Sequence, residues 1–403
     1  MKYIIVLGDG MADEPIQELK NQTPLVSAKT PTMDRLSSAG EIGMVATIPE
    51  GMKPGSDVAN LSVLGYDPKK YYTGRSPLEA LSIGIPMKLD DIAIRCNIVT
   101  ISEEGVPFEQ KTIIDHSASE IETEEAAILL EAVKKELETQ DYQFYVGTSY
   151  RHCLIWNGGS VVELTAPHDV LEEVIAPHLP ADTIMKEMMK KSYEILVNHP
   201  INVERKKRGL NPANCCWFWG AGTKPELTPF IEKTGKKGYM VSAVDLLKGM
   251  AVGTKMGIAE VEGANGGLHT NYEGKAKAVL NALLEEDYEF SYIHVEAPDE
   301  MGHQGSLERK IQAIEYLDGR VIAPIVEGLE KESVPYRMLI LPDHPTPVRL
   351  RTHTSDPVPY LLYDSTKVMK GGESYCEENA KKTGNYFANG YEVIQLLLEN
   401  NCN

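Results

Sequence analysis

The chain has 403 residues, of which 40 are Lys or Arg and 59 are Asp or Glu, so its formal net charge is −19. Apolar residues make up 42% and charged residues 25%, which is ordinary for a soluble globular protein of two domains, or of one large domain with an insertion. Such an acidic chain is a poor candidate for binding nucleic acid or an anionic membrane, because both need a basic face.

In the outer parts of the chain, strand-like and helix-like segments alternate. The predicted strands are Tyr3–Leu7, Ile42–Ile48, Tyr239–Ala243, Phe290–Val295, Tyr336–Leu341 and Val358–Tyr363. The predicted helices are Pro31–Ala39, Asp57–Leu64, Thr270–Glu286, Leu307–Leu329 and Tyr391–Glu399. This alternation predicts an α/β fold with a largely parallel central sheet flanked by helices.

The middle of the chain has a different pattern. Its predicted strands are Ala93–Ile101, Gln143–Val146, His152–Trp156 and Val161–Leu164, and its two long predicted helices are Glu124–Thr139 and Asp182–Asn198. We interpret residues 90–222 as a smaller α+β domain inserted into a discontinuous domain formed by residues 1–89 and 223–403.

The cysteine content and the N-terminus indicate the compartment. None of the six cysteines forms a C-x-x-C pair; they are Cys96, Cys153, Cys215, Cys216, Cys376 and Cys402. So few cysteines in a long chain indicate reduced thiols rather than a disulfide framework. The apolar run that ends at Leu7 is too short for a signal peptide, and no stretch is long enough to span a bilayer. We therefore expect a cytoplasmic protein.

Two polar patches in the first part of the chain follow strand-like runs. Asp9 lies between Gly8 and Gly10, just after the first strand, where open α/β sheets place their ligands. Taken alone, Asp9 is equally typical of a turn. Ser56 follows Pro54 and Gly55 at the start of a predicted helix. It reads either as an N-cap or as a nucleophile at a helix end that favours phosphate, and a nucleophilic serine needs a base or a metal.

Two further patches combine carboxylates with imidazoles. Asp299 and His303 are four residues apart, so on a helical turn they face the same way, either as a surface pair or as two ligands of one cation. Asp343 and His344 follow a hydrophobic strand after a single proline, and His353 comes nine residues after His344. Mixed carboxylate and imidazole sets suit Zn, Mn, Mg or Co.

Together these residues form one candidate set of metal ligands with a serine among them. The set is Asp9, Ser56, Asp299, His303, Asp343, His344 and His353. Seven ligands divide naturally over two divalent cations, the arrangement that clamps the attacking and leaving oxygens in phosphoryl transfer. A cation bound to Ser56 lowers the pKa of its hydroxyl, which makes Ser56 the candidate nucleophile.

The order of these residues resembles the alkaline phosphatase superfamily. The whole chain resembles, more narrowly, the archaeal-type 2,3-bisphosphoglycerate-independent phosphoglycerate mutases. The segments that carry this narrower resemblance are Gly8–Met11, Gly55–Asp57, Tyr72–Ala80, Arg95–Asn97 and the patches around Asp299 and Asp343. The resemblance implies an alkaline-phosphatase-like core and interconversion of 3- and 2-phosphoglycerate in glycolysis, without 2,3-bisphosphoglycerate.

The resemblance also implies roles for the candidate residues. One metal would be held by Asp299, His303 and His353, and the other by Asp9, Ser56, Asp343 and His344. Ser56 would carry the phosphate as a covalent phosphoserine. The inserted domain would bind the rest of the substrate, and then open and close around it.

The chain departs from this family at two places in the inserted domain. It has Asp115-His116-Ser117-Ala118-Ser119-Glu120 where the family has Asp-Arg-Arg-Ala-Gly-Arg, and Trp219 where the family has the Arg of Arg-Gly-Ala-Gly. Each missing guanidinium removes a bidentate partner for carboxylate or phosphate, on the order of 1.5–3 kcal/mol for each charged hydrogen bond. The arginines that remain as candidate anion ligands are Arg75, Arg95, Arg151 and Arg205.

Three alternatives to the mutase stay open. The segments Ser149–Cys153 and Trp217–Gly220 resemble a bacterial branch of the family proposed to phosphorylate homoserine, for which Asp115, His116 and His152 would supply mixed polar groups. Trp217, Trp219, His116 and His152 could equally be structural. A phosphatase, in which water takes the phosphate from Ser56, and a metal-binding module without catalysis are the others. The sequence has neither a Walker A motif nor Gly-x-Gly-x-x-Gly, so we expect a small phosphorylated or hydroxylated metabolite as the partner rather than a nucleotide at a known type of site.

Overall fold

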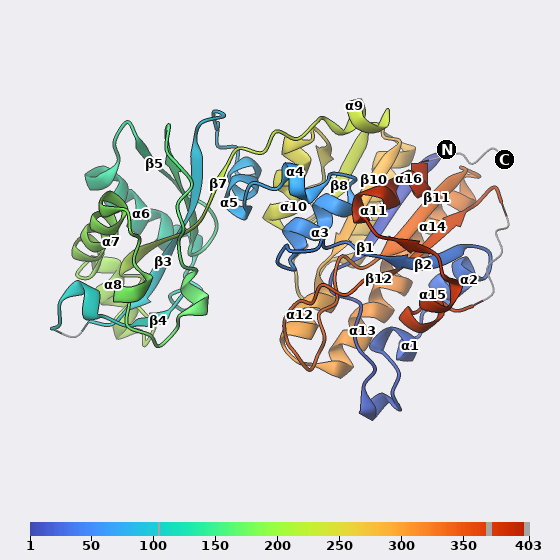
Figure 1. The fold of residues 1–403 in the computed structure, drawn as a ribbon, viewed down its shortest axis with the longest axis horizontal. Coiled ribbons are helices and arrows are strands. Elements are labelled where there is room, and N and C mark those ends of the chain that lie inside the picture. The colour runs from blue at the N-terminus through green and yellow to red at the C-terminus, as the bar shows by residue number, and fades with distance from the viewer. Residues whose placement is uncertain (104, 368–372, 399–403) are drawn as a thin grey trace. The chain divides into compact units, whose positions relative to one another are not determined.

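The computed structural model of the chain describes residues 1–103, 105–367 and 373–398 (Figure 1). Two compact units are present: unit 1 is Met1–Tyr72 with Glu226–Asn403, and unit 2 is Thr73–Pro225. Helix α5 (Arg75–Ser82) belongs to unit 2, where it contacts strands β3 and β7. The boundary in the structure therefore lies earlier than residue 90, because α5 packs on the second sheet.

Unit 1 is built on an eight-stranded sheet in the order β13-β2-β12-β11-β1-β10-β8-β9. Its strands are β1 (Lys2–Gly8), β2 (Glu41–Val45), β8 (Gly238–Val241), β9 (Gly257–Ile258), β10 (Phe290–Val295), β11 (Tyr336–Leu341), β12 (Val358–Asp364) and β13 (Tyr386–Phe387). Among these strands only β12 runs against the others. The predicted α/β class with a largely parallel central sheet is confirmed.

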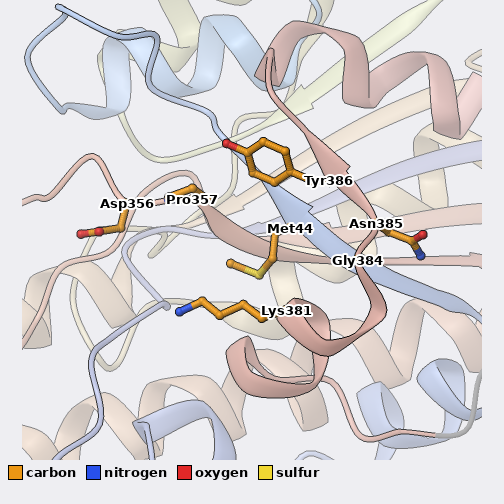
Figure 2. Close-up of a pocket in the computed structure, with 7 residues that line it drawn as sticks. All are labelled: Met44, Asp356, Pro357, Lys381, Gly384, Asn385 and Tyr386. Carbon is orange, nitrogen blue, oxygen red and sulfur yellow. The ribbon is translucent and has the colours of Figure 1, made fainter.

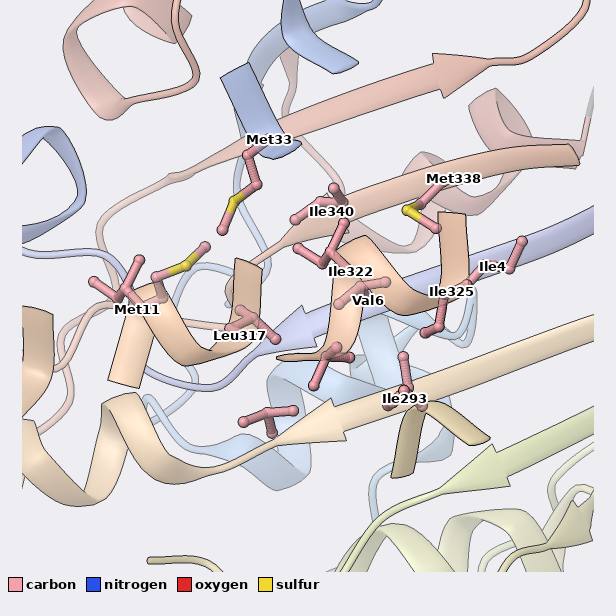
Figure 3. Close-up of a cluster of buried hydrophobic side chains, with 14 of the residues drawn as sticks. Ile4, Val6, Met11, Met33, Ile293, Leu317, Ile322, Ile325, Met338 and Ile340 are labelled. Atoms are coloured by element: carbon pink, nitrogen blue, oxygen red, sulfur yellow. The ribbon is translucent and has the colours of Figure 1, made fainter. Parts of the chain in front are cut away.

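The central strand β1 is buried along nearly its whole length, as its continuous apolar sequence requires of a strand covered on both faces. Ile4 and Val6 point to one face, where they meet Ile293, Leu317 and Ile325 in the large hydrophobic core (Figure 3). Helices α2 (Pro31–Ser38), α11 (Tyr272–Leu284), α13 (Leu307–Leu317) and α14 (Ala323–Lys331) contribute buried residues to this core.

Shorter helices complete unit 1. They are α1 (Pro24–Ser27), α3 (Ser56–Val63), α4 (Pro68–Tyr71), α9 (Phe230–Thr234), α10 (Asp245–Gly253), α12 (Ala297–His303), α15 (Glu377–Thr383) and α16 (Val393–Leu398). The predicted last helix begins as a single 3-10 turn, Gly390–Glu392, and its expected end at Glu399 lies outside the described residues. No helix in the described part of the chain is both long and apolar enough to cross a membrane.

The predicted long helix Leu307–Leu329 is interrupted in the structure. A π-helical segment, Asp318–Ile322, separates α13 from α14. The Asp318 carboxylate accepts hydrogen bonds from the backbone N–H groups of Thr32 (3.1 Å) and Met33 (2.7 Å), which are free at the start of α2. The π-helical segment therefore begins at a residue whose side chain caps another helix. The helical periodicity of the sequence does not reveal such a contact.

Unit 2 contains a second, antiparallel sheet. Its strands are β3 (Ile92–Ile101), β4 (Ile113–Asp115), β5 (Tyr142–Tyr145), β6 (Arg151–Trp156) and β7 (Cys215–Thr223), and its other helices are α6 (Thr123–Leu137), α7 (Thr183–Leu196) and α8 (Pro200–Lys207). Strand β3 pairs with β4, β6 and β7, so it is the centre of the sheet. Helices α6 and α7 supply a hydrophobic core with β3 and β7.

The predicted strand over Val161–Leu164 is wrong, since this segment has no strand conformation. Val162 and Leu164 pack their side chains on the core of unit 2, which explains their apolar pattern. The indole N–H of Trp217 donates to the carbonyl of Thr165 (2.8 Å) just beyond the segment. Side chains rather than a neighbouring strand therefore hold this part of the chain. The five cysteines in the described part of the chain are free and buried, and Cys402 lies outside it.

Candidate active site

The first group of candidate residues follows the central strands of unit 1. Strand β1 pairs in parallel with β10 on one side and β11 on the other (Figure 1). Asp9 directly follows β1, Asp343 follows β11, and Asp299 lies in α12 just after β10. Because the carboxyl ends of parallel strands meet at one edge of a sheet, three carboxylates distant in sequence reach the same place.

The loops that carry these residues approach each other closely. Gly10 has φ +60°, and a Cβ on it would lie 2.6 Å from Asp299 Oδ1 and 2.7 Å from Asp299 Cα, so only glycine fits. The buried ammonium of Lys310 donates to the carbonyls of Ala12 (3.2 Å) and Thr346 (2.7 Å). Lys310 also pairs with Asp13 at 2.8 Å. A single buried cation thus ties the loop after β1 to the loop after β11.

Asp9, Asp343 and His344 form the first cluster, in which one ligand atom from each lies within 4.8 Å of the other two. His344 Nε2 is 3.3 Å from Asp343 Oδ2 and 3.7 Å from Asp9 Oδ1. Ser56 Oγ is 3.1 Å from His344 Nε2. The structure therefore brings together the four residues that we assigned to one metal.

Asp299, His344 and His353 form the second cluster by the same criterion. His353 Nε2 lies 3.3 Å from Asp299 Oδ1, and His303 Nε2 lies 3.3 Å from Asp299 Oδ2 and 2.9 Å from His353 Nε2. The three residues assigned to the other metal are thus adjacent as well. His344 stands between the two clusters, since it belongs to both sets.

Ser56 occupies the first position of helix α3, after Gly55 in extended conformation. At the start of α3, the backbone N–H of Val58 donates to Asp57 Oδ1 (2.9 Å), whereas those of Ser56 and Asp57 have no partner within the helix and can receive an anion. One turn later, the amide of Asn60 donates to the Ser56 carbonyl (2.8 Å) and to Asp343 Oδ2 (3.0 Å). The helix therefore presents the serine hydroxyl beside the carboxylates.

The crowding of carboxylates shapes the electrostatics of the site. Burial and the nearby Asp343 and Asp299 raise the pKa of Asp9 well above its usual value. Burial also disfavours the charged form of Asp299, but hydrogen bonds from His303 and His353 outweigh it and hold the pKa of Asp299 well below its usual value. The hydrogen bond to Asp299 in turn raises the pKa of His303 to about 9.

These residues fit a pair of divalent cations. Asp9 Oδ1 is buried and has no hydrogen-bond partner, although an unpaired buried carboxylate oxygen is costly. Carboxylate, imidazole and serine oxygen are suitable donors for Mn, Mg, Zn or Co. A cation would satisfy the Asp9 oxygen and offset the mutual repulsion of the carboxylates.

Sequence reasoning missed several polar residues that surround this site. His294 Nε2 lies 2.9 Å from Asp9 Oδ2, the Tyr292 hydroxyl donates to Asn60 Oδ1 (2.5 Å), and the hydroxyl of Thr346 donates to Asp299. Tyr292 and His294 were included only as members of a predicted strand. The signal that could have found them is two polar side chains at alternate positions of a wholly buried strand.

The candidate substrate-binding residues lie in unit 2, and three of its arginines gather there. Glu79 lies between Arg75 (2.8 Å) and Arg95 (3.1 Å), and it is a further residue that sequence reasoning did not single out. The Arg95 guanidinium stacks on Trp219, 4.5 Å from the ring centroid. Arg151 contributes to the lowered pKa of Arg95, for which burial is the main cause. These groups form a cationic patch around one carboxylate.

Aromatic and imidazole rings surround this patch. His168 meets the Trp219 ring edge-on at 5.1 Å between centroids, and His116 lies 6.0 Å from His168. Tyr150 packs against His116 at 5.8 Å, and Arg151 lies over the Tyr150 ring at 5.4 Å. Of the two residues that stand where the family has arginines, Trp219 contacts Arg95 directly, and His116 joins the same group of rings through Tyr150 and His168.

Asp115 and Arg205 are engaged in a strained turn of unit 2. Residues 118–120 have φ values of 49°, 59° and 50°, in the left-handed region. Asp115 accepts hydrogen bonds from the backbone N–H groups of Ser117 (2.8 Å) and Ser119 (2.6 Å). The buried Arg205 donates to the Ala118 carbonyl and pairs with Glu125. This arrangement favours a structural role for both side chains.

His152 is buried in strand β6. Its Nδ1 accepts a hydrogen bond from the backbone N–H of Gly147 (3.1 Å), and its Nε2 has no hydrogen-bond partner. Burial lowers the pKa of His152 to about 3, so it is neutral at physiological pH. If His152 contributes a polar group to substrate binding, it would therefore do so as a neutral ring.

A separate pocket is present in unit 1 (Figure 2). It is found where β2, the loop before β12, α15 and β13 come together. The residues that line it are Met44, Asp356, Pro357, Lys381, Gly384, Asn385 and Tyr386. None of the candidate site residues contributes to it.

Comparison with known proteins agrees with the resemblance. A family model described as 2,3-bisphosphoglycerate-independent phosphoglycerate mutase matches residues 37–202. A Methanosarcina mazei protein of that name is 44% identical over 405 residues, covering 99% of this chain and all of the relative. A Geobacter sulfurreducens protein described as a probable enzyme of the same name is 46% identical, with 99% of this chain and 100% of the relative covered.

Solved structures give the same answer. A Pyrococcus horikoshii protein matches with a TM-score of 0.80 and 31% identity, over 98% of this chain and 97% of the other. The cofactor-independent phosphoglycerate mutase of Thermoplasma acidophilum matches with a TM-score of 0.64 and 27% identity, over 98% and 99%. The narrower resemblance inferred from the motifs is thereby confirmed. The chain belongs to the family of 2,3-bisphosphoglycerate-independent phosphoglycerate mutases.

Proposed function

We propose that this protein interconverts 3-phosphoglycerate and 2-phosphoglycerate through a phosphoserine at Ser56, without 2,3-bisphosphoglycerate. The observation that carries the proposal is the position of Ser56 Oγ, at the start of α3 and 3.1 Å from His344 Nε2 in the first cluster. The relatives are named 2,3-bisphosphoglycerate-independent phosphoglycerate mutases, and a mutase is an isomerase.

Two divalent cations are part of the proposal. Asp9, Ser56, Asp343 and His344 would hold one, and Asp299, His303 and His353 would hold the other. Bound cations supply positive charge that lowers the pKa of the serine hydroxyl and offsets the charge of the phosphoryl oxygens. The unpaired Asp9 Oδ1 and the crowded carboxylates support this assignment.

The residues of the chain then carry out two matched transfers. In the first, the Ser56 oxygen bonds to phosphorus, the bond from phosphorus to O3 of the substrate breaks, and O3 takes up the proton that Ser56 gives up. In the second, O2 of the glycerate bonds to phosphorus, the bond from phosphorus to the Ser56 oxygen breaks, and the Ser56 oxygen takes up the proton that O2 gives up. The backbone N–H groups of Ser56 and Asp57 at the start of α3 are suited to hold the phosphoryl oxygens in both steps.

The patch around Glu79 is the proposed site for the negative charge of the substrate. Arg75, Arg95 and Arg151 are the arginines of this patch, and guanidinium is the group best suited to a carboxylate or a phosphate. Glu79 holds two of these arginines in place in the absence of substrate. The patch therefore supports binding of a small phosphorylated metabolite.

The test is to follow purified protein with phosphorus NMR in the presence of divalent cation. With 3-phosphoglycerate, we expect the resonance of 2-phosphoglycerate to appear until equilibrium is reached. Release of inorganic phosphate alone would identify a phosphatase instead. A parallel sample with homoserine and ATP tests the homoserine alternative, which the names of the relatives described above do not support.

A further inference from the structure

Strand β10 carries two polar side chains toward the carboxylates of the first cluster. All six residues of the strand, Phe290–Val295, are buried. Tyr292 and His294 are two residues apart, so they project from the same face of the sheet. Burying a hydroxyl and an imidazole is unfavourable unless they are hydrogen-bonded, so the partners of these two groups indicate what the strand supports.

His294 holds one oxygen of Asp9. The Ser242 hydroxyl accepts a hydrogen bond from the backbone N–H of Val244 (3.1 Å) and lies 3.2 Å from His294 Nδ1. Because an ionised carboxylate only accepts hydrogen bonds, His294 Nε2 carries the ring proton and donates a hydrogen bond to Asp9 Oδ2 at 2.9 Å, which leaves Nδ1 to accept from the Ser242 hydroxyl. With Oδ2 fixed, Oδ1 is the Asp9 oxygen without a partner.

Tyr292 acts on the second carboxylate through Asn60. Its hydroxyl donates to Asn60 Oδ1, which turns the amide so that Nδ2 faces Asp343 Oδ2 at 3.0 Å. The backbone N–H of Gly10 donates to the other oxygen, Asp343 Oδ1, at 3.1 Å. Asp343 is thereby oriented from both sides.

The end of the strand is itself held in place. The buried ammonium of Lys275, on α11, donates to the backbone carbonyl of His294 at 3.1 Å. The position of the imidazole therefore does not depend on its side-chain contacts alone. A rigid support of this kind is what an oriented carboxylate site requires.

We propose that Tyr292 and His294 are positioning residues that orient Asp343 and Asp9 and so set the affinity for the divalent cation beside Ser56. This inference rests on the proposed function, because it assumes that the first cluster binds a cation. The competing explanation is that both side chains are ordinary core residues, whose hydrogen bonds only satisfy their own buried polar groups. Only the first explanation predicts that substituting these residues weakens cation binding in a protein that is still folded.

The experiment measures binding of Mn²⁺ to the metal-free protein, with free Mn²⁺ followed by electron paramagnetic resonance. The variants are Tyr292→Phe, His294→Leu and His294→Gln, in which the amide nitrogen can still donate to Asp9. The control is Tyr375→Phe, which removes a buried hydroxyl of unit 1 that bonds to the Pro359 carbonyl (2.8 Å) instead of a site residue. Circular dichroism establishes that each variant is folded.

We expect His294→Leu to bind Mn²⁺ about 10- to 100-fold more weakly, the usual effect of losing a hydrogen bond to a ligand. His294→Gln should recover most of this loss. Tyr292→Phe should bind Mn²⁺ several-fold more weakly than Tyr375→Phe. This comparison tests the inference even if His294→Leu does not fold. Equal affinity of Tyr292→Phe and Tyr375→Phe would overturn the inference while leaving the proposed function intact, whereas a wild-type protein without Mn²⁺ affinity would overturn both.

Discussion

The carboxylate clusters of unit 1 and the arginine patch of unit 2 carry charge of opposite sign and differ in the partners of their carboxylates. In unit 1, Asp9 and Asp343 are hydrogen-bonded to neutral groups such as the imidazole of His294 and the amide of Asn60. In unit 2, Glu79 lies between Arg75 and Arg95, so charges of opposite sign are already in contact. Around Asp9 and Asp343 these nearest partners do not neutralise the negative charge, whereas the patch of unit 2 has three arginines around one carboxylate and so keeps an excess of positive charge.

This difference indicates how strongly each region depends on a bound cation or substrate. Buried carboxylates without cationic partners are costly unless a metal offsets their charge. The activity of the site in unit 1 should therefore depend strongly on divalent cations. The arginines of unit 2 are preorganised by a carboxylate and by Trp219. Their loss should weaken substrate binding by a limited amount and leave the chemical step in place.

Removal of metal should have the largest effect, because it acts on the carboxylates of unit 1. Treatment with a chelator should eliminate mutase activity, and added Mn²⁺ or Mg²⁺ should restore it. Activity is measured by coupling 2-phosphoglycerate to enolase after the chelator has been removed, since enolase itself needs a cation. Full activity in a sample shown to be metal-free by elemental analysis would contradict the account of unit 1.

Ser56→Ala should come next in size. Without the hydroxyl no phosphoserine can form, so the rate should fall by roughly 10⁴-fold or more. The matched control is Ser62→Ala in the same helix, whose buried hydroxyl has no hydrogen-bond partner and whose loss should leave activity unchanged. Mass spectrometry of protein quenched during turnover should find phosphate on Ser56 in the wild type, and wild-type rates in Ser56→Ala would exclude the covalent route.

Arg205→Met separates structural from substrate-binding arginines in unit 2. Its removal leaves the carbonyls of Ala118 and Asn211 without their donor and Glu125 with one partner fewer, which should lower the free energy of unfolding by roughly 3 kcal/mol. Arg208→Met removes the exposed partner of the same Glu125 and should cost about 0–1 kcal/mol. Urea unfolding checks both. A raised KM in folded Arg205→Met would instead assign Arg205 to the substrate.

Arg151→Gln tests the substrate patch with little risk to the fold, because Arg151 is exposed at the start of β6. Loss of one charged hydrogen bond to substrate should raise KM about tenfold, with a smaller change in kcat. Arg208→Gln is the control, since it also removes an exposed guanidinium of unit 2 but pairs with Glu125, away from Glu79. Steady-state kinetics on both variants measures the difference, and an unchanged KM in Arg151→Gln would remove this residue from the patch.

The smallest expected effect concerns the pH dependence of stability in unit 2. The pKa of His152 is lowered by burial to about 3, against 6.5 for an ordinary histidine, so below about pH 6.5 the unfolded chain takes up a proton that the folded chain does not. Stability should therefore fall as the pH drops. Between pH 8 and pH 6 the wild type should lose roughly 1 kcal/mol more than His152→Gln. Urea unfolding at both values tests this, with the exposed His269→Gln as the control, which should behave as the wild type does.

The residues of the first region could be located in the sequence because they follow strands. Asp9 and Asp343 come just after apolar runs that became β1 and β11, and parallel pairing brings such positions together. His294 could not be found in this way, because it lies inside an apolar run and its importance depends on Asp9, 285 residues away. Tyr292 was missed for the same reason.

The residues of the second region were harder to assign. Arg205 has the right charge for an anion ligand, but its partner Glu125 is 80 residues away and belongs to another helix. The arginines on either side of Glu79 come from α5 and β3, and only the packing of α5 on the sheet brings them together. The wrong strand at Val161–Leu164 has a similar cause, because apolar side chains can cover a core without backbone pairing.

The most direct test of the central claim is a crystal structure with bound Mn²⁺, located by anomalous scattering. The account predicts two manganese ions in unit 1, one bonded to Asp9, Ser56, Asp343 and His344, and the other to Asp299, His303 and His353. Ligand distances should be about 2.0–2.2 Å. Two well-ordered ions at other residues, or a Ser56 oxygen out of reach of both, would contradict it.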